Sequence, residues 1–90
     1  MPEICDFYYR DEYGYTIEGC VKGSSVFKIE KRKSPYSSER PYTVRVFYRD
    51  PTCEKGYDID ESADLDEFTA NICYNADVKK YFGVGGDDNA

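Results

Sequence analysis

The residues of this chain that could do chemistry are acids, bases and tyrosines, because its 90 residues include ten tyrosines and no histidine. The densest acidic segment runs from residue 58 to residue 67. Its acidic side chains are Asp58, Asp60, Glu61, Asp64, Asp66 and Glu67. Carboxylates held on a rigid scaffold can bind a cation or a basic partner, and their spacing distinguishes the two cases.

The spacing of these acids matches a calcium-binding loop only in part. Such a loop needs a glycine at its sixth position and a bidentate glutamate at its twelfth. Ala63 and Thr69 occupy those positions here. We therefore predict no metal site and no cofactor. Two interpretations of the acids remain: a solvated segment that caps a helix, and a surface that binds a protein.

Residues 28–49 form a second candidate surface, since they carry seven basic side chains against two acidic ones. Cations interleaved with aromatic rings are typical of sheets that bind single-stranded nucleic acid. The residues of this alternative site are Lys31, Arg32, Lys33, Arg45, Arg49 and Phe47. The net charge of −6 counts against it, as does an aromatic spacing that fits no RNA-recognition motif.

Catalytic machinery is not evident in the sequence. Without histidine, a serine or cysteine nucleophile lacks its usual base, and no other spacing suggests a substitute. We predict that the protein is not an enzyme. The four cysteines form no C-x-x-C pair, which argues against zinc. The start of the chain does not resemble a signal peptide, so we expect reduced thiols and a cytoplasmic location.

The elements that must position these residues are strands, followed by a helix. Strand-like segments lie at residues 4–10, 15–21, 26–32 and 42–49, and a weaker one lies at 54–60. In residues 42–49, apolar residues alternate with Arg45 and Arg49, which is typical of a sheet with one solvated side. We predict an α+β fold: an antiparallel sheet of four to five strands with a C-terminal helix on one face.

The helix is expected to begin after Ser62 as its N-cap and to end at Gly83. Asn75 or Asp77 could break it into two helices. Its predicted apolar stripe consists of Leu65, Phe68, Ile72, Cys73 and Ala76. We predict one compact domain over residues 1–84 and a disordered acidic tail over residues 85–90. No stretch is apolar enough over sufficient length to cross a membrane.

The tyrosines outnumber what a core of this size needs. The strand alternation assigns Tyr8, Tyr15, Tyr42 and Tyr48 to the core. Tyrosine is enriched at protein interfaces, because it combines apolar area with a polar tip at low entropic cost. Tyr57 and Tyr36 are therefore candidate anchors for a protein partner, in addition to the acids.

Together these features predict a small, acidic, non-enzymatic binding protein. Its partner would be a protein or complex with a basic, nucleic-acid-handling surface, blocked sterically or by nucleic-acid mimicry. Size, acidity and the lack of catalytic machinery resemble phage-encoded inhibitors of host defence, including anti-CRISPR proteins; the similarity is one of type and not of motif. Such a protein would act in the host cytoplasm. The alternative is a single-stranded nucleic-acid-binding module that uses residues 28–49. The sequence leaves the oligomeric state and the partner's identity open.

Overall fold

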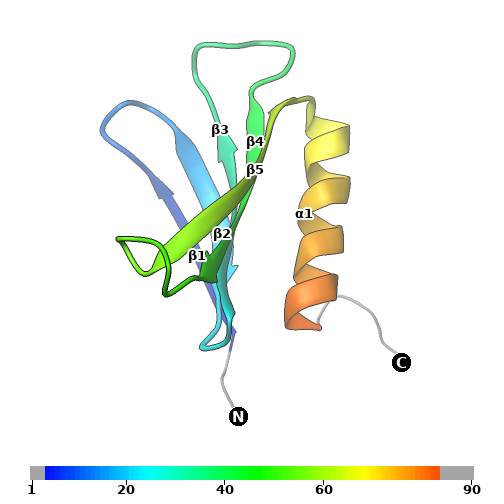
Figure 1. Ribbon diagram of the computed structural model, residues 1–90. Coiled ribbons are helices and arrows are strands. Elements are labelled where there is room, and N and C mark those ends of the chain that lie inside the picture. The colour runs from blue at the N-terminus through cyan, green and yellow to red at the C-terminus, as the bar shows by residue number, and fades with distance from the viewer. Residues whose placement is uncertain (1–3, 84–90) are drawn as a thin grey trace.

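The structure, a computed structural model, describes residues 4–83 and contains five strands and one helix in that range. The elements are β1 (Cys5–Arg10), β2 (Thr16–Val21), β3 (Val26–Lys33), β4 (Tyr42–Arg49), β5 (Tyr57–Leu65) and α1 (Glu67–Phe82). The strands pair antiparallel in chain order, so that each is joined to the next by a hairpin (Figure 1). The predicted α+β fold is confirmed. The predicted tail of residues 85–90 lies outside the described residues.

A tight turn joins β1 to β2 and determines how these strands face each other. The Gly14 N–H donates to the Asp11 carbonyl at 3.1 Å, and Gly14 has a φ of 91°, which glycine adopts at little cost. The Asp11 N–H donates to the Tyr15 carbonyl at 2.9 Å. The Asp11 carboxylate in turn accepts the backbone N–H groups of Tyr13 and Tyr15. Asp11 and Tyr15 thus form a hydrogen-bonded pair from which the rest of the β1–β2 ladder follows.

α1 covers one side of the sheet, here called the helix side, and leaves the other, the open side, uncovered (Figure 1). The helix backbone runs along β3, β4 and β5. Cys20, Ile29, Val46 and Phe82 form the buried core between helix and sheet. Tyr74 of α1 reaches further, and its hydroxyl lies 3.7 Å from the Cys20 sulfur of β2. Within residues 4–83, no helix has the length and apolar character needed to span a membrane.

The alternation predicted for β4 is confirmed by the burial of its side chains. Val44 and Val46 are buried on the helix side, while Arg45 and Arg49 lie on the open side. Phe47 shares the open side with the arginines, yet it is only 7% exposed. Neighbouring rings and a lysine cover it. The open side therefore has a small packed layer of its own.

The boundary between β5 and α1 differs from the prediction. β5 continues to Leu65, which pairs with Tyr42, so Ser62 lies within a strand and is not an N-cap. The N-cap is Asp66, whose carboxylate accepts the Thr69 N–H at 2.8 Å. Pairing with β4 supplies backbone hydrogen bonds along residues 57–65, and this overrides the local preference of the acids for a helix start.

The helix is continuous, and its buried face is not the predicted stripe. Neither Asn75 nor Asp77 interrupts it, and it ends at Gly83, which has a left-handed φ of 71° as the C-cap. Phe68 and Ile72 are 75% and 53% exposed. The residues that meet the sheet recur every fourth position instead: Ala70, Tyr74, Val78 and Phe82. Apolar residues lie on more than one face of this helix, so the path of the chain after β5 selects which face is buried.

The four tyrosines predicted for the core differ in how deeply they are buried. Tyr15, Tyr42 and Tyr48 are half-buried, whereas Tyr8, also predicted for the core, is 70% exposed. Tyr8 is exposed because it lies on β1, an edge strand that the helix does not cover.

All four cysteines are unpaired thiols, and Cys20 is buried in the core.

Gly19 is a position in the sheet that has no room for a side chain. A Cβ there would clash with the Ile29 carbonyl oxygen and would lie 2.8 Å from the Phe7 ring. We expect Gly19→Ala to lower the free energy of unfolding by about 3 kcal/mol, because β3 would have to move. Gly56→Ala is the control: its φ is 85° but the space around it is empty, so we expect a loss of about 1 kcal/mol. Urea denaturation measures both, and equal losses would contradict this account.

Candidate functional site

The acids predicted as a docking surface gather along one outer edge of the sheet. β5 is the last strand, so in the described part of the chain its outer side pairs with no other strand. The carboxylates of β5 and of the start of α1 form what we call the acidic edge. Its residues are Asp58, Asp60, Glu61, Asp64, Asp66 and Glu67, and all six are exposed. They follow one another up the strand and into the first turn of the helix (Figure 1).

Two of the six carboxylates are held by a cation or by the backbone of the helix. Glu61 accepts a hydrogen bond from Arg45 Nε at 2.7 Å, directly across the β4–β5 pair. Asp66 caps α1, and the hydrogen bond from the Thr69 backbone holds the pKa of Asp66 below its ordinary value. Glu61 is therefore partly neutralised by Arg45, whereas Asp66 keeps its negative charge and is held in place by the start of the helix.

The other four acidic residues carry charge that no neighbouring cation cancels. Among residues 4–83, no lysine or arginine forms an ion pair with Asp58, Asp60, Asp64 or Glu67. Asp58 accepts a hydrogen bond from the Tyr48 hydroxyl at 3.3 Å, and its negative charge raises the pKa of Tyr48. A hydroxyl orients a carboxylate but leaves its charge in place. The acidic edge is therefore a source of negative potential.

A bulge near the end of β5 disrupts the regular strand. The β4–β5 register shifts between the Tyr42–Leu65 and Val44–Ser62 pairs, and Asp64 has a φ of 57°. Aspartate tolerates this left-handed conformation better than branched residues do. Charges and bulges both discourage an exposed edge from pairing with another strand. This edge is therefore suited to contacts through side chains and not to strand addition.

The two tyrosines predicted as anchors lie at opposite ends of the sheet. Tyr57 begins β5, and its ring packs on the open side against Phe27 at 5.7 Å and Phe47 at 6.0 Å. Tyr36 belongs to the β3–β4 loop, is 76% exposed, and donates a hydrogen bond from its hydroxyl to the Tyr13 carbonyl. Tyr57 adjoins the acidic edge at its β5 end. Tyr36 and Tyr57 do not share one surface.

The residues of the alternative nucleic-acid site are divided between the two sides of the sheet. Lys31 and Lys33 project to the helix side, where the Lys31 ammonium contacts Asn71 of α1 and lies 3.7 Å from Glu18. The remaining members lie on the open side: Arg32, Arg45, Arg49 and Phe47. The structure thus brings four of the six together.

One buried carboxylate lies on the open side, where the alternation of β3 predicts a solvated residue. Glu30 is 2% exposed, and one of its oxygens lies 3.5 Å from an Arg32 nitrogen. Lys28 and Arg45 approach it at 3.8 Å and 3.9 Å. Gly19, opposite it on β2, provides the space. Gly19 was the one residue in the sequence that could have indicated a buried Glu30. It could do so only for a reader who already knew that Gly19 pairs with Glu30 across β2 and β3.

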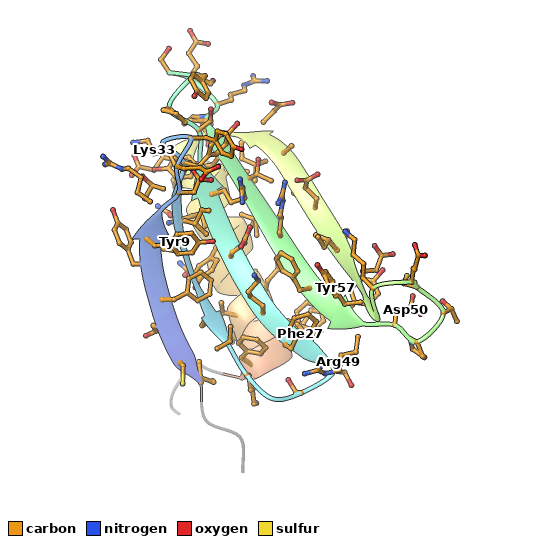
Figure 2. The ribbon with its side chains drawn as sticks, turned by 90° about the vertical axis from the view of Figure 1, so that its left-hand side faces the viewer. Tyr9, Phe27, Lys33, Arg49, Asp50 and Tyr57 are labelled. Carbon is orange, nitrogen blue, oxygen red and sulfur yellow. The ribbon has the colours of Figure 1, made fainter. Side chains whose placement is uncertain are left out.

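Aromatic rings on the open side pack on one another and on cations. The rings of Phe27, Phe47 and Tyr57 lie within 5.7–6.1 Å of each other. Lys28 lies 4.2 Å from the centre of the Phe47 ring, and Arg49 lies 4.8 Å from that of Phe27. Figure 2 shows Phe27, Arg49 and Tyr57 gathered near one end of this side. Rings that already stack on side chains offer less free face for a nucleic-acid base.

Three side chains that could hold a metal meet at the β4–β5 turn. The ligand atoms of Asp50, Cys53 and Asp58 lie within 4.8 Å of one another. The Asp50 carboxylate already accepts the N–H and hydroxyl of Thr52, which lowers the pKa of Asp50. Burial, followed by the hydrogen bond to Asp50, raises the pKa of the Cys53 thiol, whereas a metal binds the thiolate. The hydrogen bonds of Asp50 and Cys53 are therefore explained by the β4–β5 turn to which these residues belong.

Comparison with protein families, with curated proteins and with solved structures gave no match for this chain.

The buried Glu30 predicts a large effect of a small substitution. We expect Glu30→Gln to lower the free energy of unfolding by about 2 kcal/mol, because three cations would lose the charge that holds them over the sheet. Glu61→Gln is the control, since Glu61 is exposed and pairs with Arg45 alone; we expect a loss below about 1 kcal/mol. Urea denaturation at neutral pH measures both. A loss for Glu30→Gln no greater than for the control would show that the pairing is unimportant.

Asp77 of α1 gives a prediction about pH. Burial, followed by the negative charge of Asp60, raises the pKa of Asp77 above its ordinary 3.8. The folded state therefore binds this proton more tightly than the unfolded chain, and stability falls as the pH rises past that value. We expect Asp77→Asn to raise the urea midpoint at neutral pH and to leave it unchanged near about pH 3, where the carboxyl is protonated in both states. The same increase at both pH values would contradict the electrostatic cause.

Proposed function

We propose that this chain is a small, non-enzymatic binding protein that docks through its acidic edge on a protein with a basic, nucleic-acid-handling surface. In this proposal the docked protein blocks that surface sterically or by acting as a nucleic-acid mimic. The observation that supports it is the uncancelled charge of Asp58, Asp60, Asp64 and Glu67. Cations on a partner would supply the missing counter-charges and would also speed the encounter.

The fate of the chain's own cations strengthens this argument. Lys28, Arg32 and Arg45 converge on Glu30, and Lys31 pairs with Glu18 on the helix side. Four of the six basic side chains of β3 and β4 are thus engaged with acids of the sheet, whereas Lys33 and Arg49 lie against the rings of Tyr42 and Phe27. On β4, the strand beside β5, Arg45 is shared between Glu30 and Glu61, and Arg49 lies 4.8 Å from the centre of the Phe27 ring. Neither arginine forms an ion pair with Asp58, Asp60, Asp64 or Glu67.

The spacing of the acids is compatible with mimicry of a phosphate backbone. Asp58 and Asp60 project to the same side of β5, because they occupy alternate positions of the strand. Two residues so placed lie about 6.7 Å apart along the strand, roughly twice the rise per phosphate along one DNA strand. The rigid β4–β5 ladder holds them in that order, so little entropy is lost when a partner binds.

The alternative function, binding of single-stranded nucleic acid, has weaker support. Its residues lie on two sides of the sheet, and the rings on the open side stack on one another and on Lys28 and Arg49. Arg32 and Arg45 are paired with acids. A phosphate would therefore have to displace an existing carboxylate partner at each of these arginines.

A pair of charge-matched variants tests the proposed function. Asp60→Lys with Glu67→Lys reverses charge within the acidic edge, and Glu12→Lys with Glu39→Lys makes the same net change at exposed positions outside it. We expect tagged wild-type protein and the control to retain the same partner from the source cell, and the edge variant to lose it. With that partner purified, calorimetry should give a dissociation constant at least about tenfold higher for the edge variant.

Two further measurements decide the outcome. Circular dichroism must show that both variants keep the fold. Equal binding by the edge variant and the control would overturn the proposal. Fluorescence anisotropy with a labelled single-stranded oligonucleotide at physiological salt tests the alternative, and binding that Arg45→Glu with Arg49→Glu abolishes would favour it instead.

A further inference from the structure

The two edges of the sheet are protected unequally. β5 carries a row of carboxylates and a bulge, which discourage strand pairing. β1, at the opposite edge, pairs with β2 in unbroken register and has neither a bulge nor a proline. Its centre is three consecutive aromatic residues: Phe7, Tyr8 and Tyr9. Figure 2 shows this strand with Tyr9 at the far side of the sheet from Tyr57. An exposed edge of this kind is a template for another strand.

The turn after β1 shows which backbone groups face outward. Hydrogen-bonded and non-hydrogen-bonded pairs alternate along an antiparallel ladder. Asp11 and Tyr15 are a hydrogen-bonded pair, so the backbone groups of Tyr9 and Phe7, two and four residues earlier, point toward β2. The β1 residues whose N–H and C=O groups point away from the sheet are Asp6, Tyr8 and Arg10.

We propose that β1 pairs with β1 of a second copy of this chain, antiparallel about a two-fold axis beside Tyr8. In this register Tyr8 faces Tyr8 of the second copy, and Asp6 faces Arg10 of the second copy. Phe7 then faces Tyr9 of the second copy. By symmetry the last two pairings each occur twice, which makes a closed, isologous dimer with a continuous sheet.

This register satisfies the backbone and the side chains together. The outward backbone groups of the two copies meet one another and can form about six hydrogen bonds. The two Asp6–Arg10 pairs join opposite charges, and the two Phe7–Tyr9 pairs join rings. A shift of two residues in either direction keeps the backbone pattern but loses both ion pairs. One such shift also places Asp6 opposite Glu12, a pair of like charges.

Within residues 4–83, the surroundings of β1 leave room for a second copy. Tyr8 and Tyr9 are 70% and 47% exposed. Asp6 and Tyr8 project to the helix side, as their β2 neighbours Cys20 and Glu18 do, and α1 runs over β3, β4 and β5 instead. A hollow lined in part by Asp6, Tyr8 and Tyr74 adjoins the strand there. The acidic edge lies at the opposite side of the sheet, so the dimer would leave both copies of that edge exposed.

Charge exchange within β1 tests the dimer and its register. Asp6→Arg and Arg10→Asp each turn both ion pairs into like-charge pairs, so we expect the dimer dissociation constant from sedimentation equilibrium to rise at least about tenfold. Combining the two substitutions in one chain restores opposite charges and should restore the homodimer. Mixing the two single variants should give a heterodimer, because one copy then carries both arginines and the other both aspartates.

A backbone variant provides an independent check. Tyr8→Pro removes an N–H that points away from β2, so it should abolish the dimer while circular dichroism shows that the fold is kept. A wild-type protein that is monomeric at all concentrations would overturn the proposal. So would a dimer that neither single charge variant weakens, or one that the double exchange fails to restore.

Discussion

The burial of Glu30 on the open side of the sheet is the constraint from which the charge distribution of this molecule follows. A carboxylate that is 2% exposed needs compensation, and Lys28, Arg32 and Arg45 supply it from the same strand and from β4. Lys28 and Arg32 are thereby held over the surface of the sheet, while Arg45 lies between Glu30 and Glu61 of β5. Four of the seven basic side chains in the middle of the chain are thus paired with acids within the fold, whereas Asp58, Asp60, Asp64 and Glu67 form no ion pair in the described residues.

The helix imposes a second constraint, because it is too narrow to cover five strands. Its backbone runs along β3, β4 and β5, and the residues of β1 remain largely exposed. The open side is sealed in part by its own rings, with Phe47 buried under Phe27, Tyr57 and Lys28. Large aromatic side chains bury much area each, which lets a small domain build packed layers on both sides of one sheet. This accounts for much of the aromatic content of the chain.

The two edges of the sheet consequently differ in what they can bind. The edge formed by β5 presents negative charge, and its acids and bulge disfavour pairing with another strand. The edge formed by β1 offers unpaired backbone and rings, with one acid and one base placed symmetrically about Tyr8. The proposed docking surface and the proposed dimer use these opposite properties, so neither proposal depends on the other.

The sequence by itself determined the types of the elements and their order. Period-two alternation in residues 42–49, turn residues between the strands and Gly83 at the helix end are local signals, and each corresponds to a feature of the structure. It also determined that residues 58–67 carry concentrated negative charge. Local spacing, however, misplaced the helix start at Ser62 and the apolar stripe at Phe68 and Ile72.

Only the tertiary structure decided which faces are buried and which charges cancel. Pairing with β4 drew residues 61–65 into a strand, and the resulting start at Asp66 turned Ala70, Tyr74, Val78 and Phe82 toward the sheet. The space for Glu30 exists because Gly19 lies opposite it on another strand. Burial and ion pairing depend on residues that the pairing of strands brings together. The local sequence around each residue does not determine the register of that pairing.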